Sequence, residues 1–515
     1  MSALAAPSPA PLPPMQGSAR TLAALAVSLG TFLNVLDTTI ANVSIPAIAG
    51  DLGVSVSQGT WVITSFAVSN AIFVPLTGWL TQRFGAVKLF SLSVLLFTLA
   101  SFLCGLASSI EMLIACRVLQ GMVAGPMVPL SQALLLSIFP PDKAPTALAA
   151  SAMTTLVAPV LGPILGGYIS DNYSWPWIFY INLPVGLLSA WAAWRLLRHR
   201  ESATRRVPID YVGVILLIIW VGSLQIILDK GRELDWFESP TIMMLAVAAV
   251  VGFCFFLVWE LTDRHPIVDL SLFKIRNFTF GVLTLSLGYG LFFSSVVLVP
   301  LWLQQYMGYT ATWAGLLTAT SGVLALIFSP PIARMMPTIG ARVVATFSFA
   351  VFGVVSLMRS NFNTSADWTV IVVPQILMGL AIGIFFISLM SIVLAGLPPQ
   401  RIPSASGLAN FARITAGAFS ASLFTTAWDS RAAMHHAHLS ENITPLSAST
   451  DTVINQLQNG GLGTEQALAV LEQQLTTQAY MLGINDLFWL VAVLNIAAIG
   501  LVWMTRPIGA NKSGR

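Results

Sequence analysis

One carboxylate, Asp37, interrupts a long run of uncharged residues near the start of the chain. No other charged residue occurs between Leu22 and Ala49. A charged carboxylate near the centre of a bilayer costs about 2.5–3.5 kcal/mol on insertion scales. A group that gains and loses a proton inside the membrane would explain that cost, so Asp37 is a candidate for proton coupling. The alternative is that Asp37 lies at the outer membrane interface and ends the helix, beside the polar Thr38 and Asn42.

A cation is expected at the same depth as Asp37. At a rise of about 1.5 Å per residue, Asp37 lies about 22 Å along a helix that begins near Leu22, which leaves about 8 Å of a core about 30 Å thick. Arg117 lies about 9 Å along a helix that enters from the opposite face near Glu111.

Burial favours the neutral carboxyl of Asp37, and a nearby guanidinium favours the carboxylate. Protonation of Asp37 would therefore release Arg117 to another partner, either Gln120 or a substrate anion. Such a local change of charge can switch an element that has two stable arrangements. The alternative is that Arg117 only binds backbone carbonyls and has a structural role.

The composition is that of a polytopic membrane protein. Of 515 residues, 56% are hydrophobic and only 9% are charged, whereas a soluble globular protein has about 25% charged residues. The formal net charge of +3 is small, so nucleic acid is not an expected partner. The three cysteines, Cys104, Cys116 and Cys254, all fall in apolar runs, which does not indicate a disulfide framework.

The sequence does not indicate an enzyme. It shows no set of nucleophile and base, no metal-binding cluster and no phosphate-binding loop, and no cofactor is expected. His435, His436 and His438 lie close together, which admits a metal site, but they also suit a solvated loop.

The chain divides into fourteen candidate membrane spans. A helix needs about 20 mostly apolar residues to cross the hydrocarbon core. With both termini in the cytoplasm, eighteen Lys and Arg residues lie on the cytoplasmic side and four lie outside, as the positive-inside rule requires. The candidate spans are residues 22–48, 60–81, 88–108, 111–137, 146–169, 178–198, 211–229, 241–261, 278–304, 312–335, 342–358, 368–395, 404–428 and 484–505.

Two segments of the first half of the chain recur in the second half. Residues 117–142 resemble residues 375–400 at an offset of 258, and residues 75–89 resemble residues 331–345. Two matches in the same order at nearly the same offset predict a duplicated architecture. The predicted parts are a disordered cytoplasmic tail 1–20, a six-helix half 21–200, two inserted helices 201–265, a second six-helix half 266–505 with a periplasmic loop 431–480, and a cytoplasmic tail 506–515.

Several motifs together resemble one transporter family. GWLTQRFGAVKL (78–89) is similar to the loop signature after the second helix of major facilitator transporters, and RVLQGMVAG (117–125) to the signature of their fourth helix. LDTTIANVSIP (36–46) and APVLGPILGG (158–167) are similar to the first- and fifth-helix signatures of the fourteen-helix drug:proton antiporters. The chain thus resembles that family. Longer stretches, among them SQGTWVITSF (57–66) and GYTATWAGL (308–316), resemble the EmrB- and FarB-like exporters within it.

The resemblance implies an all-α major facilitator fold and a proton-driven exporter in the bacterial inner membrane. The implied substrates are hydrophobic or amphipathic toxic compounds such as drugs, uncouplers or fatty acids. The implied partners are a periplasmic membrane-fusion adaptor and an outer-membrane channel. The alternatives are a dedicated exporter of one metabolite or siderophore, and a membrane scaffold or sensor that does not transport.

The resemblance also assigns roles to two groups of small and basic residues. A helix bend that seals the cavity against proton leak is expected at Gly162, Pro163, Gly166 and Gly167; simple helix packing is the alternative. A gating loop is expected at Gly78, Arg83, Gly85 and Lys88, although topology alone explains the charges. The family often has an acid where this chain has Gln82, so the gating charge pair of its relatives is in doubt here.

A second embedded cation, Arg413, suggests a cavity in the second half. A buried cation suits an anionic or amphipathic substrate. The alternative is that Arg413 extends to the cytoplasmic interface, since it lies near that end of its helix. The residues expected to line the cavity are Asn34, Gln304, Gln305, Asn410 and Arg413.

Overall fold

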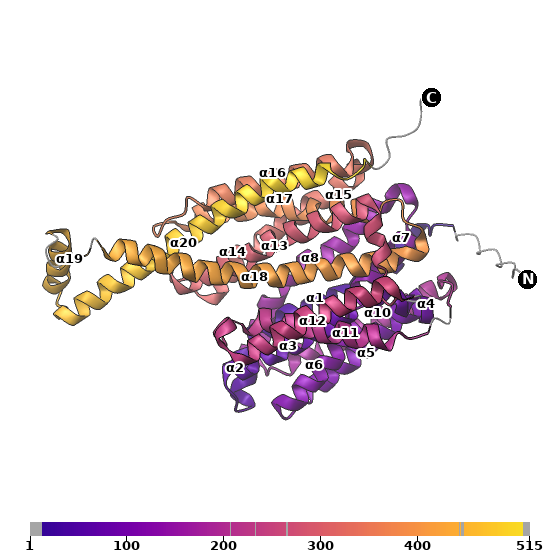
Figure 1. Cartoon of the computed structure of the whole chain (residues 1–515), viewed down its shortest axis with the longest axis horizontal. Helices are drawn as coiled ribbons and strands as arrows, with labels where there is room; N and C mark the ends of the chain where they lie inside the picture. The colour runs from indigo at the N-terminus through magenta and orange to yellow at the C-terminus, as the bar shows by residue number, and fades with distance from the viewer. Residues whose placement is uncertain are drawn as a thin grey trace, which may run out of the picture.

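The computed structural model describes residues 13–205, 208–231, 233–263, 266–441, 443 and 448–507. Most of the predicted N-terminal tail and most of the C-terminal tail therefore lie outside the described residues. Within the described ranges the chain is helical and contains no strand (Figure 1). The predicted all-α class is confirmed.

The first part of the chain, up to Thr262, is helical in its described residues. Some successive helices are separated only by a bend, as in α3 and α4, which meet at an angle of 64°. The helices are α1 (Gly17–Asp51), α2 (Val56–Gly59), α3 (Trp61–Phe73), α4 (Thr77–Phe84), α5 (Ala86–Gly105), α6 (Ile110–Ala124), α7 (Met127–Ile138), α8 (Ala144–Asn172), α9 (Trp177–Tyr180), α10 (Asn182–Leu197), α11 (Tyr211–Lys230) and α12 (Pro240–Thr262).

The second part of the chain, from Arg276 on, is likewise helical in its described residues. Its helices are α13 (Arg276–Gln305), α14 (Ala311–Ala319), α15 (Ser321–Ile339), α16 (Ala341–Arg359), α17 (Trp368–Val393), α18 (Ile402–Ser440), α19 (Ala448–Asn459) and α20 (Thr464–Trp503).

Several helices begin where a side chain caps the first turn. Ser109, Asp210, Thr310 and Asp367 each accept a hydrogen bond from the backbone N–H three residues later, which satisfies a donor that the helix leaves unpaired. At Asp367, just before α17, bonds from the Thr369 hydroxyl and the Val370 N–H lower the pKa of the carboxyl. These caps fix the starts of α6, α11, α14 and α17.

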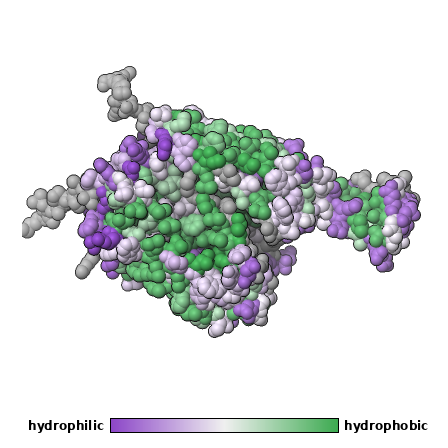
Figure 2. Space-filling view, turned by 180° about the vertical axis from the view of Figure 1, so that it is seen from behind, coloured by the Kyte–Doolittle hydropathy of each residue, from purple (hydrophilic) through white to green (hydrophobic). Residues whose placement is uncertain are grey.

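Every predicted span overlaps a helix or a pair of helices, but the number of membrane spans stays a prediction. Among the described residues, eleven helices are long and apolar enough to cross a membrane, or twelve when α3 and α4 count as one span. Helices α8 and α18 are not among them. Figure 2 shows that apolar residues cover the middle of the visible face, with hydrophilic residues toward its ends, as expected for a surface that faces lipid.

The repeated segments adopt the same local structures. Gly85 and Gly340, which the repeat aligns, both have positive φ, +87° and +92°, and a helix starts directly after each. Glycine adopts this conformation without strain. In the other repeat, Gly121 packs against α3 and Gly379 packs against the start of α15. Equivalent helices therefore meet in the same way in both halves.

The segment 431–480 is predicted to be a loop, but most of its described residues are helical. Helix α18 continues to Ser440, α19 follows, and α20 begins at Thr464. We call the part of α18 from Asp429, together with α19 and the part of α20 up to Met481, the helical projection. It extends beyond the rest of the molecule at the end away from the start of α1 (Figure 1).

Hydrogen bonds between side chains join α18 to α20, the two long helices of the projection. His435 Nε2 lies 2.8 Å from a carboxylate oxygen of Asp486, and His436 Nε2 lies 2.8 Å from one of Glu472. No group of three metal-ligating side chains occurs among the residues that the structure describes. His435 and His436 thus contribute to the contact between α18 and α20.

Candidate functional site

Asp37 lies in the interior of α1 and is fully buried. The helix continues for fourteen residues beyond it, to Asp51, and the side chain has no solvent exposure. The alternative in which Asp37 ends the helix at the membrane interface does not match this position. A buried charge needs a partner and hydrogen bonds, and the surrounding helices provide both.

Three side chains donate hydrogen bonds to the carboxylate of Asp37. Arg117 on α6 forms a buried ion pair with Oδ2 through its NH1 group. Gln120 Nε2, one turn further along α6, lies 3.1 Å from Oδ1, and Asn182 Nδ2 at the start of α10 also lies 3.1 Å from Oδ1. Asp37 and Arg117, which the sequence places at similar depth, are therefore in contact.

Arg117 is held by more than its carboxylate. Its Nε donates to the carbonyl of Val62 on α3 at 3.0 Å, and its guanidinium lies 4.3 Å from the ring centre of Phe66. Its NH1 group also donates to Gln120 Oε1 at 2.8 Å, while NH2 has no hydrogen-bond partner. Arg117 thus combines the structural role and the ion pair that the sequence left as alternatives.

The sequence analysis missed Asn182, Ser101 and Cys104. Asn182 Nδ2 also lies 3.0 Å from Ser101 Oγ on α5, and Cys104 Sγ lies 3.6 Å from Gln120 Oε1. All three side chains are buried. For Asn182, the signal in the sequence was one polar residue within the largely apolar stretch WPWIFYINLPVG (175–186). Single polar residues of this kind are common in membrane helices.

Glycines of α8 allow it to pack closely on α1 beside Asp37. A Cβ at Gly162 would collide with the Thr39 hydroxyl, and one at Gly166 would lie 2.8 Å from the carbonyl of Ile40. Thr39 Oγ1 lies 3.3 Å from the carbonyl of Ala158. Gly167 is half-buried, and Pro163 lies in α8 with its side chain outside the described part. These glycines place α8 against the residues that follow Asp37; their role in sealing the cavity stays a prediction.

The expected gating loop joins α4 to α5. Gly85 forms its turn, and the Glu201 carboxylate accepts hydrogen bonds from the backbone N–H groups of Val87 at 2.9 Å and Lys88 at 2.8 Å. The guanidinium of Arg83 lies 5.6 Å from the ring of Trp79. This chain has Gln82 where the family often has an acid, but the acidic Glu201 lies close to the same loop. Glu201 caps the start of α5.

Gly78 in α4 brings the two halves of the molecule into contact. A Cβ at Gly78 would overlap the side chain of Ser404 at the start of α18, and Gly407 in α18 packs against the carbonyl of Val74. Gln132 Oε1 on α7 accepts hydrogen bonds from Ser406 and, at 3.0 Å, from Asn410 Nδ2. The halves are therefore closed together at the end predicted to be cytoplasmic.

Replacing Gly78 with leucine is expected to open this contact. Overpacking costs about 1–3 kcal/mol, which corresponds to roughly a five- to hundredfold shift toward the open arrangement. The measurement is labelling, from the side predicted to be cytoplasmic, of a cysteine introduced at Ser151, in a background without native cysteines. Gly500→Leu is the control, because nothing lies within 4 Å of a Cβ there. Equal labelling of both variants would contradict the prediction.

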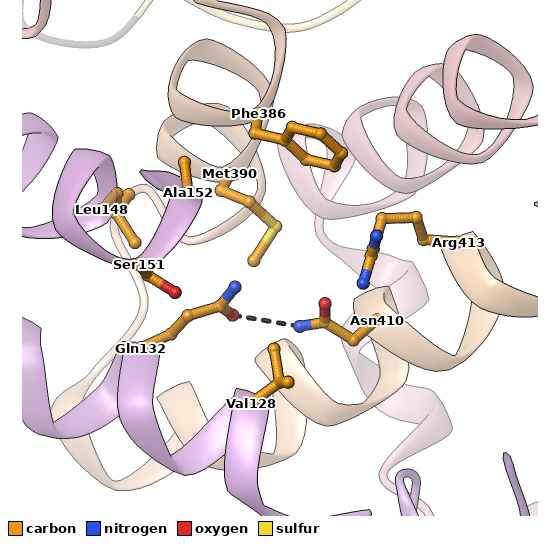
Figure 3. A pocket seen from close by; sticks show the side chains of 9 residues that line it. All are labelled: Val128, Gln132, Leu148, Ser151, Ala152, Phe386, Met390, Asn410 and Arg413. Atoms are coloured by element: carbon orange, nitrogen blue, oxygen red, sulfur yellow. Dashed lines mark hydrogen bonds between the residues drawn. The ribbon is translucent and has the colours of Figure 1, made fainter. Parts of the chain in front are cut away.

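A cavity lies directly beside this contact, between the two halves (Figure 3). Figure 3 shows the side chains of Gln132, Asn410 and Arg413 converging on it. The lining residues are Val128, Gln132, Leu148, Ser151, Ala152, Phe386, Met390, Asn410 and Arg413.

Only two of the five residues expected at the cavity, Asn410 and Arg413, line it. Asn34 is buried and donates to the carbonyl of Ala124 at 3.3 Å. Gln304 and Gln305 are exposed at the end of α13. The sequence placed these residues on the correct helices but could not determine which faces of those helices point inward.

Arg413 is buried against aromatic rings. The residue is 7% exposed. Its guanidinium lies 4.5 Å from the ring centre of Tyr289 and 5.5 Å from that of Phe386. Cation–π contacts of this kind stabilise a desolvated cation. Arg413 therefore faces the cavity, whereas an extension to the membrane interface would leave it exposed.

The second half contains another buried cation, Arg359, which directly follows the candidate span 342–358 and is one of the four Lys and Arg residues that were placed outside the membrane. It lies at the end of α16, is 2% exposed, and donates to Gln375 Oε1. Gln375, which the repeat aligns with Arg117, donates to the carbonyl of Thr318 at 3.2 Å. Gln375 thus makes the kind of carbonyl contact that Arg117 makes in the first half.

Comparison with known proteins gives consistent matches over nearly the whole chain. The profile of the Major Facilitator Superfamily matches residues 27–421. The multidrug export protein EmrB of Escherichia coli is 50% identical over 503 residues, which cover 97% of this chain and 98% of that protein. The fatty acid resistance protein FarB of Neisseria gonorrhoeae is 45% identical over 96% of this chain and 98% of that protein.

Solved structures of low sequence similarity share the fold. The human organic anion transporter MFSD10 (TETRAN) has a TM-score of 0.60 at 15% identity, over 95% of this chain and all of that one. The proton:xylose symporter XylE has a TM-score of 0.60 at 14% identity, over 94% of this chain and 95% of that one. At these identities the likeness concerns the fold alone.

Proposed function

This chain belongs to the major facilitator superfamily and is a multi-pass transporter of the inner membrane, not an enzyme, and we propose that it exports amphipathic compounds in exchange for protons. The observation that carries the proposal is the buried network around Asp37. It contains one carboxylate, one cation and several neutral hydrogen-bonding groups that are fully enclosed. Such a site can bind a proton and change its contacts as a result.

Proton binding at Asp37 would change the packing of α1 against α6. The ionised carboxylate forms an ion pair with Arg117, whereas the neutral carboxyl offers Arg117 only a weaker, uncharged hydrogen bond. The bond from Arg117 Nε to the Val62 carbonyl on α3 does not depend on the charge of Asp37. Loss of the ion pair therefore lets α1 move relative to α3 and α6. This movement favours one of the two arrangements of the halves over the other.

Arg413 and the aromatic rings beside it favour an anionic amphiphile as substrate. The cavity combines this cation with the polar side chains Gln132 and Asn410, and with the apolar Phe386 and Met390. An apolar body binds the adaptable Met and aromatic surfaces, and an acidic head group binds the guanidinium. The relative FarB carries fatty acid resistance in its name, in line with this class.

We further propose that the transporter works with a periplasmic adaptor and an outer-membrane channel through the helical projection. This part of α18, α19 and α20 extends beyond the apolar surface (Figure 2) and is stiffened by the pairs of His435 with Asp486 and of His436 with Glu472. Fourteen spans with both termini in the cytoplasm would place the projection in the periplasm.

Proton exchange driven by a permanently ionised substrate tests the proposal. Weak acids carry protons through lipid by themselves, so the probe is an aromatic sulfonate, added to proteoliposomes that hold a pH gradient. We expect the sulfonate to dissipate the gradient only when the protein is present. Sulfonate uptake without proton movement would contradict proton coupling, and no uptake of sulfonate would contradict the anionic substrate class.

Replacing Arg413 with glutamine is expected to weaken binding of the sulfonate about tenfold, which corresponds to ~1.4 kcal/mol. Glutamine removes the charge but retains a polar side chain. Transport of an uncharged aromatic compound should change little. The measurement is the KM for each compound, with Arg401→Gln, at a surface ion pair, as the control. An equal rise of both KM values would show that Arg413 has only a packing role.

A further inference from the structure

Asn182 contacts Asp37 in a way that the proton-coupling scheme above does not use. The residue is fully buried at the start of α10. Its Nδ2 donates to Asp37 Oδ1 at 3.1 Å and to Ser101 Oγ at 3.0 Å. Its Oδ1 has no hydrogen-bond partner. A buried amide oxygen without a hydrogen-bond partner destabilises the folded protein, so this arrangement needs an explanation.

The groups around Asp37 suit the ionised carboxylate only. In the arrangement seen, Arg117 NH1, Gln120 Nε2 and Asn182 Nδ2 all donate to it. A protonated carboxyl has its own O–H donor and needs an acceptor. Gln120 Oε1 already accepts from Arg117 at 2.8 Å and lies 3.6 Å from Cys104 Sγ. The Oδ1 atom of Asn182 is the buried amide oxygen of this network without a partner.

We propose that Asn182 is a positioning residue for proton exchange, whose amide donates to the ionised Asp37 and, after a half-turn, accepts a hydrogen bond from the protonated Asp37. The inference rests on the proposed function, in which Asp37 carries the proton. An incoming proton binds Oδ1 of Asp37, and the new O–H donates to Oδ1 of Asn182. The amide plane of asparagine can turn in this way because its oxygen and nitrogen are nearly equal in size.

The turn of the amide would pass the change to two further helices. Ser101 on α5 loses its bond from Asn182 Nδ2 and keeps its own bond to the carbonyl of Phe179, which is 2.9 Å long. Helix α10 is tied to α1 by a bond from Ser189 to the carbonyl of Ala26. Proton binding at one carboxyl would therefore reset contacts of α1 with α6 and α10, and of α10 with α5.

Few other ionisable groups could produce the same pH dependence. On α6 these are Arg117 and Cys116, and on α5 the group is Cys104. The described residues of α8 and α10 provide no ionisable side chain near Asp37. The response of the site to pH should thus report the protonation of Asp37, and the neighbouring side chains should set its midpoint.

The test is infrared difference spectroscopy of the purified protein during a pH titration, compared with Asn182→Leu. The C=O band of the protonated Asp37 is identified by its loss in Asp37→Asn. Leucine removes a donor to the charged form and an acceptor for the neutral form. Because a hydrogen bond to a charged group is stronger than one between neutral groups, we expect the protonation midpoint to rise by about one pH unit.

A second signature is specific to the acceptor role of Asn182. Without that acceptor, the C=O band of the protonated Asp37 should move to higher frequency. In the unmodified protein, isotope-labelled asparagine should show an amide band that changes with the same midpoint, and this measurement needs no variant that must fold. Asn495→Leu is the matched control, because Asn495 is also buried with a free Oδ1 but bonds only to the carbonyl of Val491 on its own helix.

The outcomes separate the two proposals. If no carboxyl band is lost in Asp37→Asn, Asp37 does not bind the proton and the proposed function fails. If Asp37 titrates but Asn182→Leu keeps both the midpoint and the C=O frequency, the role of Asn182 is refuted while proton coupling stands. A midpoint that shifts equally in Asn495→Leu would also refute it, since that residue is remote from Asp37.

Discussion

Replacing Asp37 with asparagine is expected to reduce substrate-driven proton movement to the level of liposomes without protein. Asparagine has the shape of the protonated carboxyl and accepts a hydrogen bond from Arg117, but it cannot exchange a proton. The variant should fold, because it resembles a neutral state through which the transporter passes in every cycle. Exchange of labelled for unlabelled substrate across the membrane, which needs no net proton transfer, should continue.

The two assays on this variant distinguish a coupling role from a structural one. Loss of proton movement together with retained substrate exchange assigns the proton to Asp37. Asp269→Asn, which removes a half-exposed carboxylate paired with Arg401, is the control and should behave as the unmodified protein. Proton movement at the normal rate in Asp37→Asn would refute the proposal, and loss of both activities would indicate that the carboxylate is needed for structure.

Replacing Arg117 with methionine is expected to be the most destabilising single change in the buried network. The variant leaves the Asp37 carboxylate buried without its cation and also removes the bond to the Val62 carbonyl. Breaking a buried ion pair by removing one partner costs about 3–5 kcal/mol. The measurement is the melting temperature of the purified protein, which should fall by several degrees or more.

The double variant Arg117→Met with Asp37→Leu should recover most of this loss. Replacing both members of a buried pair with apolar groups is often neutral, so the cycle of single and double variants isolates the pair. Arg413→Met is the matched control, because it removes a buried cation that contacts aromatic rings and the cavity. This change should lower the melting temperature less than Arg117→Met does. A double variant no more stable than Arg117→Met would show that the carbonyl contact, not the ion pair, dominates.

The two halves share a contact pattern but differ in charge. Arg117 in the first half and Gln375 in the second each donate to a carbonyl on a neighbouring helix. Only the first half adds a carboxylate, Asp37, to the cation. In the second half the buried cation is Arg359 on α16, which donates to Gln375. Among the described residues, the two halves therefore share the packing contact, while the fully buried pair of a carboxylate with a cation lies in the first half.

The pairing of Asp37 with Arg117 could be predicted because it depends on local quantities. The rise per residue and the alternating direction of the spans fix the depth of a residue on its own helix. The same applies to the positions of the helices and to the repeated turns at Gly85 and Gly340. Each follows from short stretches of apolar residues, charges, glycines and prolines, which act within a few residues of the chain.

The tertiary structure decided what depends on the rotation of one helix against another. Asn182 reaches Asp37, and Arg359 points inward, because helix packing turns these faces toward the core, and depth alone does not determine the direction. Gln304 and Gln305 are exposed at the end of α13 for the same reason. The polar segment 431–480 is helical because α18 and α20 support each other, whereas an isolated polar helix is marginal in water. Local sequence therefore determined the helices and the depth of the chemistry, and packing between helices decided which side chains complete the site.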